Sequence, residues 1–208
     1  MYRALWKRVI DTTISIVAML VLSPILFVVA LAIKFTSPGP ILFKQQRLGL
    51  HGKEFTIYKF RSMAVGTERT GSGVYSEKDD PRVTKIGKFI RATSIDELPQ
   101  LINIIVGDMA IVGPRPPLTY HPWPLEQYTE EQLHMFDVRP GITGWAQVHG
   151  RNLASWEEKF AYDVEYVQKI SFALDMKIVF LTVRCVFARE GINSDAPDSK
   201  VTMSEFRG

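Results

Sequence analysis

The 208-residue sequence contains a single cysteine, Cys185, and its few histidines are widely spaced. One cysteine excludes an intrachain disulfide, which fits a reducing compartment such as the cytoplasm. No cysteine and histidine cluster has the spacing of zinc ligands, so no zinc site is predicted. The scattered histidines are His51, His121, His134 and His149. The sequence also has no 20–50-residue repeat and no low-complexity tract, which excludes a solenoid or a repeat array.

An excess of charge of one sign is also absent. The chain has 25 basic and 22 acidic residues, for a net charge of +3. This excludes a global polycation, and nucleic acid is not an expected partner, although local basic surfaces remain possible. A hydrophobic content of 46% can supply a core, and 23% charged residues argue against wholesale disorder. The length suits one domain, or one domain with appended elements.

One long hydrophobic run is present, ISIVAMLVLSPILFVVALAI at residues 14–33, without a charge between Asp11 and Lys34. Twenty helical residues cover roughly 30 Å, about the thickness of the hydrocarbon layer. A signal peptide fits poorly because no A-x-A-like cleavage site follows. A buried helix of a soluble protein would need a larger domain around it. The run therefore predicts insertion into a membrane.

Ser23 and Pro24 stand at the middle of this run. Pro24 cannot donate to the carbonyl of Leu20, so a bent helix is expected, with the Ser23 hydroxyl free to bond a released backbone group. Basic residues lie on both sides: Arg3, Lys7 and Arg8 before the run, then Lys34, Lys44 and Arg47 after it. A hairpin that enters and leaves by one leaflet keeps both groups in the cytoplasm, whereas a straight span does not. A kinked span has the same pattern, so both topologies stay open, with the re-entrant form preferred.

The rest of the chain predicts an α+β domain. SPGP at residues 37–40 is a rigid turn, and two short strands are expected around residues 41–44 and 55–60. Residues 66–80 are polar and predict a loop. The segment RVTKIGKFIRA has a cation at every third position, Arg82, Lys85, Lys88 and Arg91. On a helix these form a broad basic face, either solvated or facing an anionic surface or phosphate.

Two helices are predicted near the end of the chain. The first begins at a capping box of Ser155 and Glu158, and the second covers residues 172–190 as an amphipathic helix. Asp175, Lys177 and Arg184 interrupt its apolar face, which argues against a second membrane span.

Two adjacent carboxylates, Asp96 and Glu97, lie in the stretch TSIDELPQ. One interpretation makes Ser94 and Glu97 a capping box, so that Glu97 is structural. Pro99 then falls inside the helix, where its nitrogen cannot donate. In the other interpretation the helix begins at Pro99, and both carboxylates precede it, near unpaired amides that suit metal or phosphate. Both interpretations remain open from these residues alone.

The helix that follows the two carboxylates has an apolar pattern typical of a buried stripe, made of Leu98, Leu101, Ile102 and Ile105. Further on, VGPRPP at residues 112–117 excludes a helix and places Arg115 on a stiff loop. An arginine held between prolines loses less entropy on binding phosphate.

Several motifs in one order resemble the bacterial sugar transferases called monotopic phosphoglycosyl transferases. They are SPGP, FKQQRLGLHGKEFTIYKFRSM, DDPRVTKIGKFIRATSIDELPQLINIIVGDMAIVGPRP, RPGITGWAQVHGRN and LDMKI, and they cover nearly the whole chain. In length the chain is similar to the small members, which consist of the catalytic domain alone.

The resemblance implies a re-entrant membrane helix within residues 1–36, broken at Ser23-Pro24, and a cytoplasmic catalytic domain of residues 37–208. It implies an enzyme of the bacterial inner membrane that moves a sugar-1-phosphate from a UDP-sugar to a polyprenol phosphate. Asp96 falls on the nucleophile of the family, with Glu97 beside it. Other family motif positions, which the resemblance implies bind the substrate or its phosphates, fall on Lys59, Arg61, Arg91, Arg115 and Asp175.

The implied chemistry is a pair of displacements at phosphorus, with a covalent phosphosugar on Asp96 and ping-pong kinetics. Mg²⁺ on Asp96 and Glu97 would offset the repulsion between carboxylate and diphosphate. Arg61, Arg91 and Arg115 are candidates to bind the remaining phosphate charge. The competing hypotheses are a membrane-anchored scaffold that binds anionic lipid and a phosphohydrolase that uses the same carboxylate. The sequence does not identify the sugar or the oligomeric state.

Overall fold

The computed structural model describes residues 2–67, 80–149 and 154–188. Most of the predicted loop at 66–80 lies outside these residues. The α-helices and strands that follow one another along the chain are α1 (Lys7–Thr36), β1 (Leu42–Leu48), β2 (Glu54–Phe60), α2 (Lys85–Ala92), α3 (Leu101–Val106), β3 (Ala110–Val112), α4 (Glu130–Leu133), β4 (Gly141–Thr143), α5 (Trp145–His149), α6 (Trp156–Lys169) and α7 (Phe172–Ala188). Short π- and 3-10 segments, η1 (Tyr2–Trp6), η2 (Leu50–Gly52), η3 (Ile95–Gln100), η4 (Leu125–Gln127) and η5 (His134–Asp137), lie between them. The mixture of helices with two small sheets confirms the α+β class.

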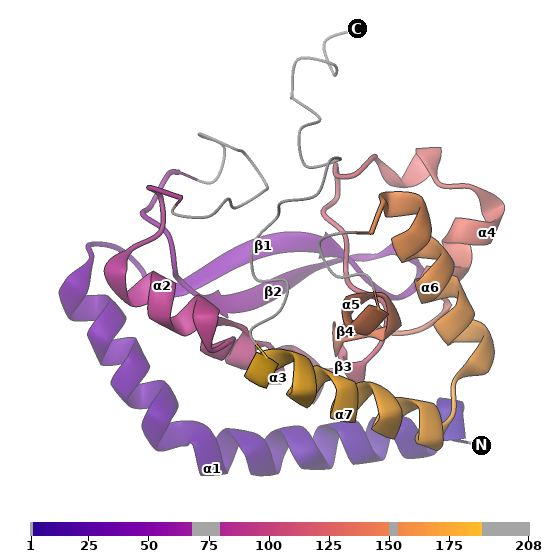
Figure 1. The fold of residues 1–208 in the computed structure, drawn as a ribbon, viewed down its shortest axis with the longest axis horizontal. Coiled ribbons are helices and arrows are strands. Elements are labelled where there is room, and N and C mark those ends of the chain that lie inside the picture. The colour runs from indigo at the N-terminus through magenta and orange to yellow at the C-terminus, as the bar shows by residue number, and fades with distance from the viewer. Residues whose placement is uncertain (1, 68–79, 150–153, 189–208) are drawn as a thin grey trace, which may run out of the picture.

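Helix α1 runs along one side of the molecule and bends partway along its length (Figure 1). It contains Pro24 and yet continues to Thr36, so the predicted break is a bend within one continuous helix. The Ser23 hydroxyl donates to the Leu20 carbonyl at 2.8 Å. Leu20 is the residue whose carbonyl Pro24 leaves without its usual donor, so the predicted compensation is confirmed.

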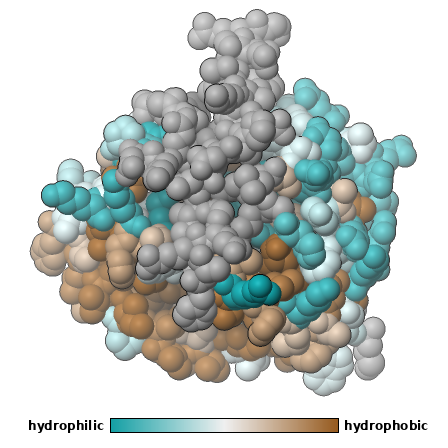
Figure 2. All heavy atoms as spheres, in the orientation of Figure 1, coloured by the Kyte–Doolittle hydropathy of each residue, from teal (hydrophilic) through white to brown (hydrophobic). Residues whose placement is uncertain are grey.

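The outward face of α1 is apolar and uncovered. The helix is long and apolar enough to cross a membrane, and only 11% of its most apolar window is buried. Leu20, Val21 and Phe27 are each more than 60% exposed. In Figure 2 hydrophobic residues gather along the lower side of the molecule, where Figure 1 places α1, and hydrophilic residues gather on the right. Such a surface suits lipid rather than water.

The inward face of α1 packs against the rest of the chain at both ends. Near its C-terminus, Val29 and Ile33 join a buried cluster with Phe60 of β2 and Ile90 of α2. Near its N-terminus, Arg8 donates to the carbonyl oxygens of Ile104 and Ile105 at the end of α3. A cation at that position offsets the negative end of the α3 dipole. The α1 helix is therefore bound to the elements that carry the candidate site.

The first strand is longer than the sequence predicted. Strands β1 and β2 form an antiparallel hairpin, in which Phe43 pairs with Lys59 and Arg47 with Phe55. A second sheet pairs β3 with β4 in parallel. The prediction of the late helices is confirmed, and α6 begins with the expected capping box of Ser155 and Glu158. The proline-rich segment 113–117 is non-helical, as predicted.

The predicted apolar stripe of α3 was wrong in part. Leu101 is buried, but Ile102 is 38% exposed, and Ile104 is fully buried in its place. The reason is that residues 95–100 form a 3-10 segment, so that α3 begins only at Leu101. A 3-10 segment turns more per residue than an α-helix, which shifts the face that meets the core.

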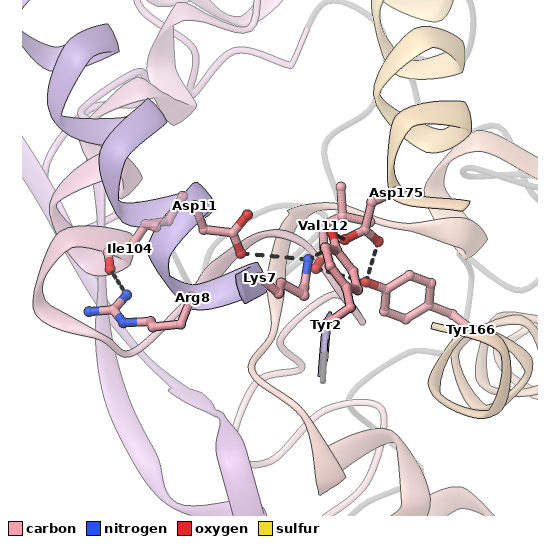
Figure 3. A network of polar contacts seen from close by, with 8 residues as sticks. All are labelled: Tyr2, Lys7, Arg8, Asp11, Ile104, Val112, Tyr166 and Asp175. Carbon is pink, nitrogen blue, oxygen red and sulfur yellow. Dashed lines mark hydrogen bonds and ion pairs between the residues drawn. The ribbon is translucent and has the colours of Figure 1, made fainter. Parts of the chain in front are cut away.

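A buried polar network joins the N-terminus to α6 and α7 (Figure 3). Asp175 on α7 is 2% exposed and accepts hydrogen bonds from Lys7 Nζ at 2.7 Å, from the Tyr166 hydroxyl at 2.7 Å and from the Tyr2 hydroxyl. Lys7 also lies 3.5 Å from Asp11. The network connects segments that are 168 residues apart in sequence.

Candidate active site

Asp96 and Glu97 lie in the 3-10 segment η3, directly before α3. Ser94 precedes them with φ of 56°, and its side chain makes no capping hydrogen bond. A helical segment does begin after Ser94, as the first interpretation predicted, but it is a 3-10 segment without the capping box, and the α-helix begins at Leu101 rather than at Pro99. The left-handed residue turns the chain sharply after α2. This turn places both carboxylates between the end of α2 and the β1–β2 hairpin.

Glu97 is held by two cations from different elements. Its Oε1 atom lies 2.8 Å from Nζ of Lys59 on β2 and 3.4 Å from a guanidinium nitrogen of Arg115. The structure thus brings together three residues that the sequence predicted for one site. Lys59 is mostly covered, whereas the Arg115 side chain is 48% exposed and open to a ligand.

The two carboxylates have opposite acid–base properties. Burial, followed by repulsion from Glu97, raises the pKa of Asp96 to about 6, against the influence of Lys59 and Arg91. Burial would also raise the pKa of Glu97, but the charges of Lys59 and Arg115 outweigh it and lower the pKa to about 2. Two titratable neighbours whose pKa values diverge are typical of catalytic sites.

Arg91 contributes to the site through its electrostatic interaction with Asp96. It lies in the last turn of α2, which Thr84 caps by accepting from the Gly87 amide, and its charge lowers the pKa of Asp96. Lys85 and Lys88 are exposed on the same helix. Arg82, predicted for the same basic face, precedes α2 and forms a buried ion pair with Asp80 at 2.6 Å.

Arg47 is a further cation near the carboxylates, although its sequence position indicated only a basic residue flanking the apolar run. The Arg47 guanidinium interacts electrostatically with both Lys59 and Glu97. Burial, and then repulsion from the charge of Arg115, lower the pKa of Arg47 to about 10. In β1 and β2, residues 43, 45 and 47 pair with 59, 57 and 55, so Arg47 and Lys59 share one face of the hairpin. Alternate residues of a strand point to the same face. A predicted first strand that continued to residue 48 would therefore have placed Arg47 on the same face as Lys59.

Arg61 does not contact Asp96 or Glu97, the two adjacent carboxylates that we call the dyad. It is 4% exposed, and its guanidinium donates to the carbonyls of Ser37 and Pro38 and to the Ser37 hydroxyl at 2.7 Å. Gly39, with φ of +119°, leaves room for this guanidinium, which a Cβ would meet at 2.1 Å. Arg61 therefore fixes the turn that follows α1, and a phosphate-binding role does not fit this geometry.

Asp175 is also remote from the dyad by its contacts. Its carboxylate oxygens are occupied by Lys7, Tyr2 and Tyr166 in the buried network of Figure 3. The geometry gives it a structural role in place of the substrate-binding role predicted for it. Ser23 and Pro24 act only on the shape of α1, as described above.

Asp96 and Glu97 can supply only part of the ligands that a divalent cation needs. Among the described residues no group of three histidine, cysteine or acidic side chains is placed to hold a metal. Two neighbouring carboxylates are the usual protein contribution to Mg²⁺, which takes its other ligands from water and substrate phosphates. A cation bound nearby would lower the pKa of Asp96, which burial raises in its absence. The residues present therefore fit Mg²⁺ bound together with a phosphate substrate.

Comparison with known proteins shows the family of this chain. Residues 2–189 match the family model described as bacterial sugar transferase. The uncharacterized sugar transferase EpsL of Bacillus subtilis is 46% identical over 202 residues, which cover 97% of this chain and 96% of the relative.

Two further relatives have names that state an activity. The UDP-glucose:undecaprenyl-phosphate glucose-1-phosphate transferase of Escherichia coli is 45% identical over 86% of this chain, which spans 39% of that relative. The UDP-N-acetylgalactosamine-undecaprenyl-phosphate N-acetylgalactosaminephosphotransferase of Aeromonas hydrophila is 39% identical over 89% of this chain, which spans 44% of that relative. The chain thus spans about two fifths of these longer proteins, and its dyad, its cations and its apolar α1 all lie within the matched family region: it belongs to the bacterial sugar transferases.

Proposed function

We propose that this protein transfers a sugar-1-phosphate from a UDP-sugar to undecaprenyl phosphate or a related polyprenol phosphate, releasing UMP. This would be the first membrane step in building a bacterial glycoconjugate. The observation that carries the proposal is the charge balance of the site. Two adjacent carboxylates are surrounded by four cations, Arg47, Lys59, Arg91 and Arg115. An excess of positive charge suits a diphosphate, and the names of the relatives supply its chemical class.

The role of nucleophile falls to Asp96. Its carboxylate oxygen bonds to the sugar-bearing phosphorus, the bond from that phosphorus to the UMP oxygen breaks, and UMP leaves. An oxygen of the acceptor phosphate then attacks the same phosphorus and releases Asp96 as carboxylate, so the kinetics are ping-pong. Glu97, with its low pKa and two cation partners, stays ionised and keeps Lys59 and Arg115 in place.

The cations reduce the electrostatic repulsion between the attacking carboxylate and the diphosphate of the donor. Two like unit charges about 4 Å apart repel by about 4 kcal/mol at an effective dielectric constant of about 20. That penalty corresponds to about a thousandfold in rate. Arg91 next to Asp96, and Arg115 with its exposed guanidinium, lower the repulsion between carboxylate and diphosphate. Mg²⁺ held by Asp96 and Glu97 would neutralise more of the phosphate charge when bound.

The membrane arrangement we propose is re-entrant, with the dyad at the cytoplasmic face of the bacterial inner membrane. The bend of α1 at Pro24 supports it, as do the basic residues on both flanks of the apolar run. An acceptor phosphate lies at headgroup depth, and a shallowly inserted enzyme presents its nucleophile at that depth. Exposed Phe172, Met176 and Phe180 add apolar surface on α7, which is connected to the start of α1 by the hydrogen bond from Lys7 to Asp175.

The test is a panel of UDP-sugars, including UDP-glucose and UDP-N-acetylgalactosamine, incubated with the protein in detergent with Mg²⁺. UMP and the lipid product are measured with and without polyprenol phosphate. We expect stoichiometric UMP without acceptor, and continuous UMP with a polyprenyl diphosphate sugar of the expected mass when acceptor is added. Continuous UMP release without lipid would indicate a phosphohydrolase. No release from any donor would favour an anionic-lipid-binding scaffold.

A further inference from the structure

Asn103 is a polar residue on the buried side of α3, a helix whose other residues are all apolar. It is 0% exposed, and the buried residues next to it on the helix are Leu101 and Ile104. A side-chain amide in such a place costs folding free energy unless its donor and acceptor atoms are satisfied. An apolar side chain would avoid that cost, so the partners of the amide indicate why it is there.

The short hydrogen bonds of the Asn103 side chain are to the backbone of β2. Its Oδ1 atom accepts from the Tyr58 amide at 3.1 Å, and its Nδ2 atom donates to the Thr56 carbonyl oxygen at 2.7 Å. A third contact, from Nδ2 to Oδ2 of Asp108, is 3.5 Å long. The two backbone groups lie on either side of Ile57, so a shift of the strand by a single residue would break both short bonds.

The same stretch of β2 carries Lys59. Alternate residues of a strand point to one face, so Ile57 and Lys59 point the same way. Ile57 is buried in a cluster with Leu101 and Ile104 of α3, and Lys59 Nζ lies 2.8 Å from Glu97. Because η3, which contains Glu97, leads directly into α3, the contact between Lys59 and Glu97 depends on where β2 lies along that continuous segment.

Apolar packing alone would fix this position weakly. Contacts between apolar side chains have no preferred direction, so they allow β2 to shift along α3. A shift by two residues would keep Lys59 on the same face and move it about 7 Å along the strand direction. The two hydrogen bonds of Asn103 are directional and fit one register only. A buried asparagine that fixes register at a cost in stability is also known from coiled coils.

We propose that Asn103 is a positioning residue: its side-chain amide fixes the register of β2 on α3 and thereby holds the Lys59 ammonium group beside Glu97. Asn103 acts through Lys59 and does not touch the reacting atoms. This deepens the proposed function and rests on it only for the assay of activity, because the contacts of Asn103 with β2 need no substrate.

Hydrogen exchange measured by mass spectrometry tests the contact without any assay of activity. Asn103→Leu has the same branching at Cγ and removes both hydrogen bonds, so a peptide covering residues 54–60 should gain about one fast-exchanging deuteron or more. Asn103→Asp keeps an acceptor oxygen for the Tyr58 amide and should exchange as the wild type does. Ile104→Val trims the cluster that contains Ile57 and leaves the amide in place. It is the matched control and should leave the peptide unchanged.

A double-mutant cycle with Lys59→Met tests the consequence. In the wild-type background, Asn103→Leu should lower kcat/KM for the donor by about tenfold or more. In the Lys59→Met background the same substitution should cost less than about twofold, because the charge through which Asn103 acts is gone. A purely structural role would lower kcat/KM equally in both backgrounds, as we expect for Ile104→Val.

An unchanged exchange rate in Asn103→Leu, or an equal loss of activity in the two backgrounds, would overturn the proposal. If Asn103→Leu fails to fold, Asn103→Ala, which leaves room for water beside β2, replaces it in both experiments with the same expectations. If the wild type releases no UMP from any donor, the proposed function fails, and the exchange experiment still decides whether Asn103 holds β2.

Discussion

Asp96 and Glu97 are adjacent in the chain, and their different partners give them different acid–base properties. Glu97 faces Lys59 and Arg115 directly, at 2.8 and 3.4 Å. Asp96 is affected more by burial and by the negative charge of Glu97. A carboxylate that is less stabilised by cations is also the stronger nucleophile, because less energy is needed to remove its partners. The roles that we propose for Asp96 and Glu97 are based on these different contacts.

Titration of the metal-free protein should resolve the two carboxyl groups. In ¹³C NMR spectra recorded with a chelator present, the Asp96 carboxyl should titrate with a pKa of about 6, and Glu97 with a pKa of about 2. Because the pKa of Asp96 is raised, this proposed nucleophile is protonated on passing from pH 7 to pH 5, where an ordinary aspartate stays ionised. Assignment comes from the signals lost in Asp96→Asn and Glu97→Gln. A value near 4 for Asp96 would contradict the described environment.

Replacing Asp96 by asparagine should abolish turnover and leave the fold intact. An amide cannot form the acyl phosphate, so UMP release should fall by about a thousandfold or more. The melting temperature should stay the same or rise, since burial disfavours the charge that is removed. Glu97→Gln is the control for local packing, and it should retain a covalent adduct at a reduced rate. Full UMP release by Asp96→Asn would remove Asp96 as nucleophile.

At the level of single residues, the structure brings some of the predicted site residues together and places others apart, while their roles in the reaction stay predictions. Asp96, Glu97, Lys59, Arg91 and Arg115 meet as expected. Arginine has the same chemistry whether it binds phosphate or a backbone carbonyl, so the sequence alone could not separate the two uses. Only the fold shows that the Arg61 guanidinium is hydrogen-bonded to Ser37 in the turn after α1.

At the level of elements, the proposed membrane arrangement depends on the shape of α1. Pro24 removes a hydrogen bond within α1, and the Ser23 hydroxyl satisfies the Leu20 carbonyl that is left without its usual donor. We expect Pro24→Ala to straighten α1 and shift part of the population toward a spanning topology. Ser23→Ala should leave the topology unchanged, because the proline ring still clashes with the preceding turn.

Cysteine labelling measures this effect. A single cysteine is added ahead of Met1 in a Cys185→Ser background, and an impermeant maleimide is applied to either side of the membrane. The wild type should be labelled only from the cytoplasmic side, and Pro24→Ala in part from the other side. Purely cytoplasmic labelling of Pro24→Ala would show that another feature determines the topology.

Periodicity predicted the elements well where they are long and poorly where they are short. The apolar run predicted α1, and the capping box of Ser155 and Glu158 predicted the start of α6. The six residues of α3 are too few for a period of 3.6 to stand out, and a 3-10 segment that precedes them shifts the buried face. Strand β1 was predicted too short because Gln45, Gln46 and Arg47 read as polar loop, although they alternate between the two faces of the hairpin.

At the level of the whole molecule, the network around Asp175 connects the start of α1 to α6 and α7 (Figure 3). Asp175→Ala leaves Lys7 with one partner fewer in a buried site. Breaking a buried ion pair costs about 3–5 kcal/mol, which corresponds to a fall of about 10 °C in melting temperature. The KM for the donor should change little, since Asp175 does not face the dyad.

Lys169→Ala is the control for this measurement. It breaks an exposed pair with Glu165 of the same 2.7 Å length and should cost less than about 1 kcal/mol. An unchanged melting temperature for Asp175→Ala, together with weaker donor binding, would restore the substrate-binding role that the sequence predicted for it.

The whole account depends on a covalent bond between Asp96 and phosphorus. The most direct measurement is the mass of the intact protein after brief incubation with its UDP-sugar donor and Mg²⁺ in the absence of lipid, followed by peptide mapping. The account predicts one added phosphosugar on the peptide that contains Asp96, one UMP released per adduct, and loss of the adduct when polyprenol phosphate is supplied. UMP that appears only when donor and acceptor are present together, with the protein mass unchanged, would contradict it.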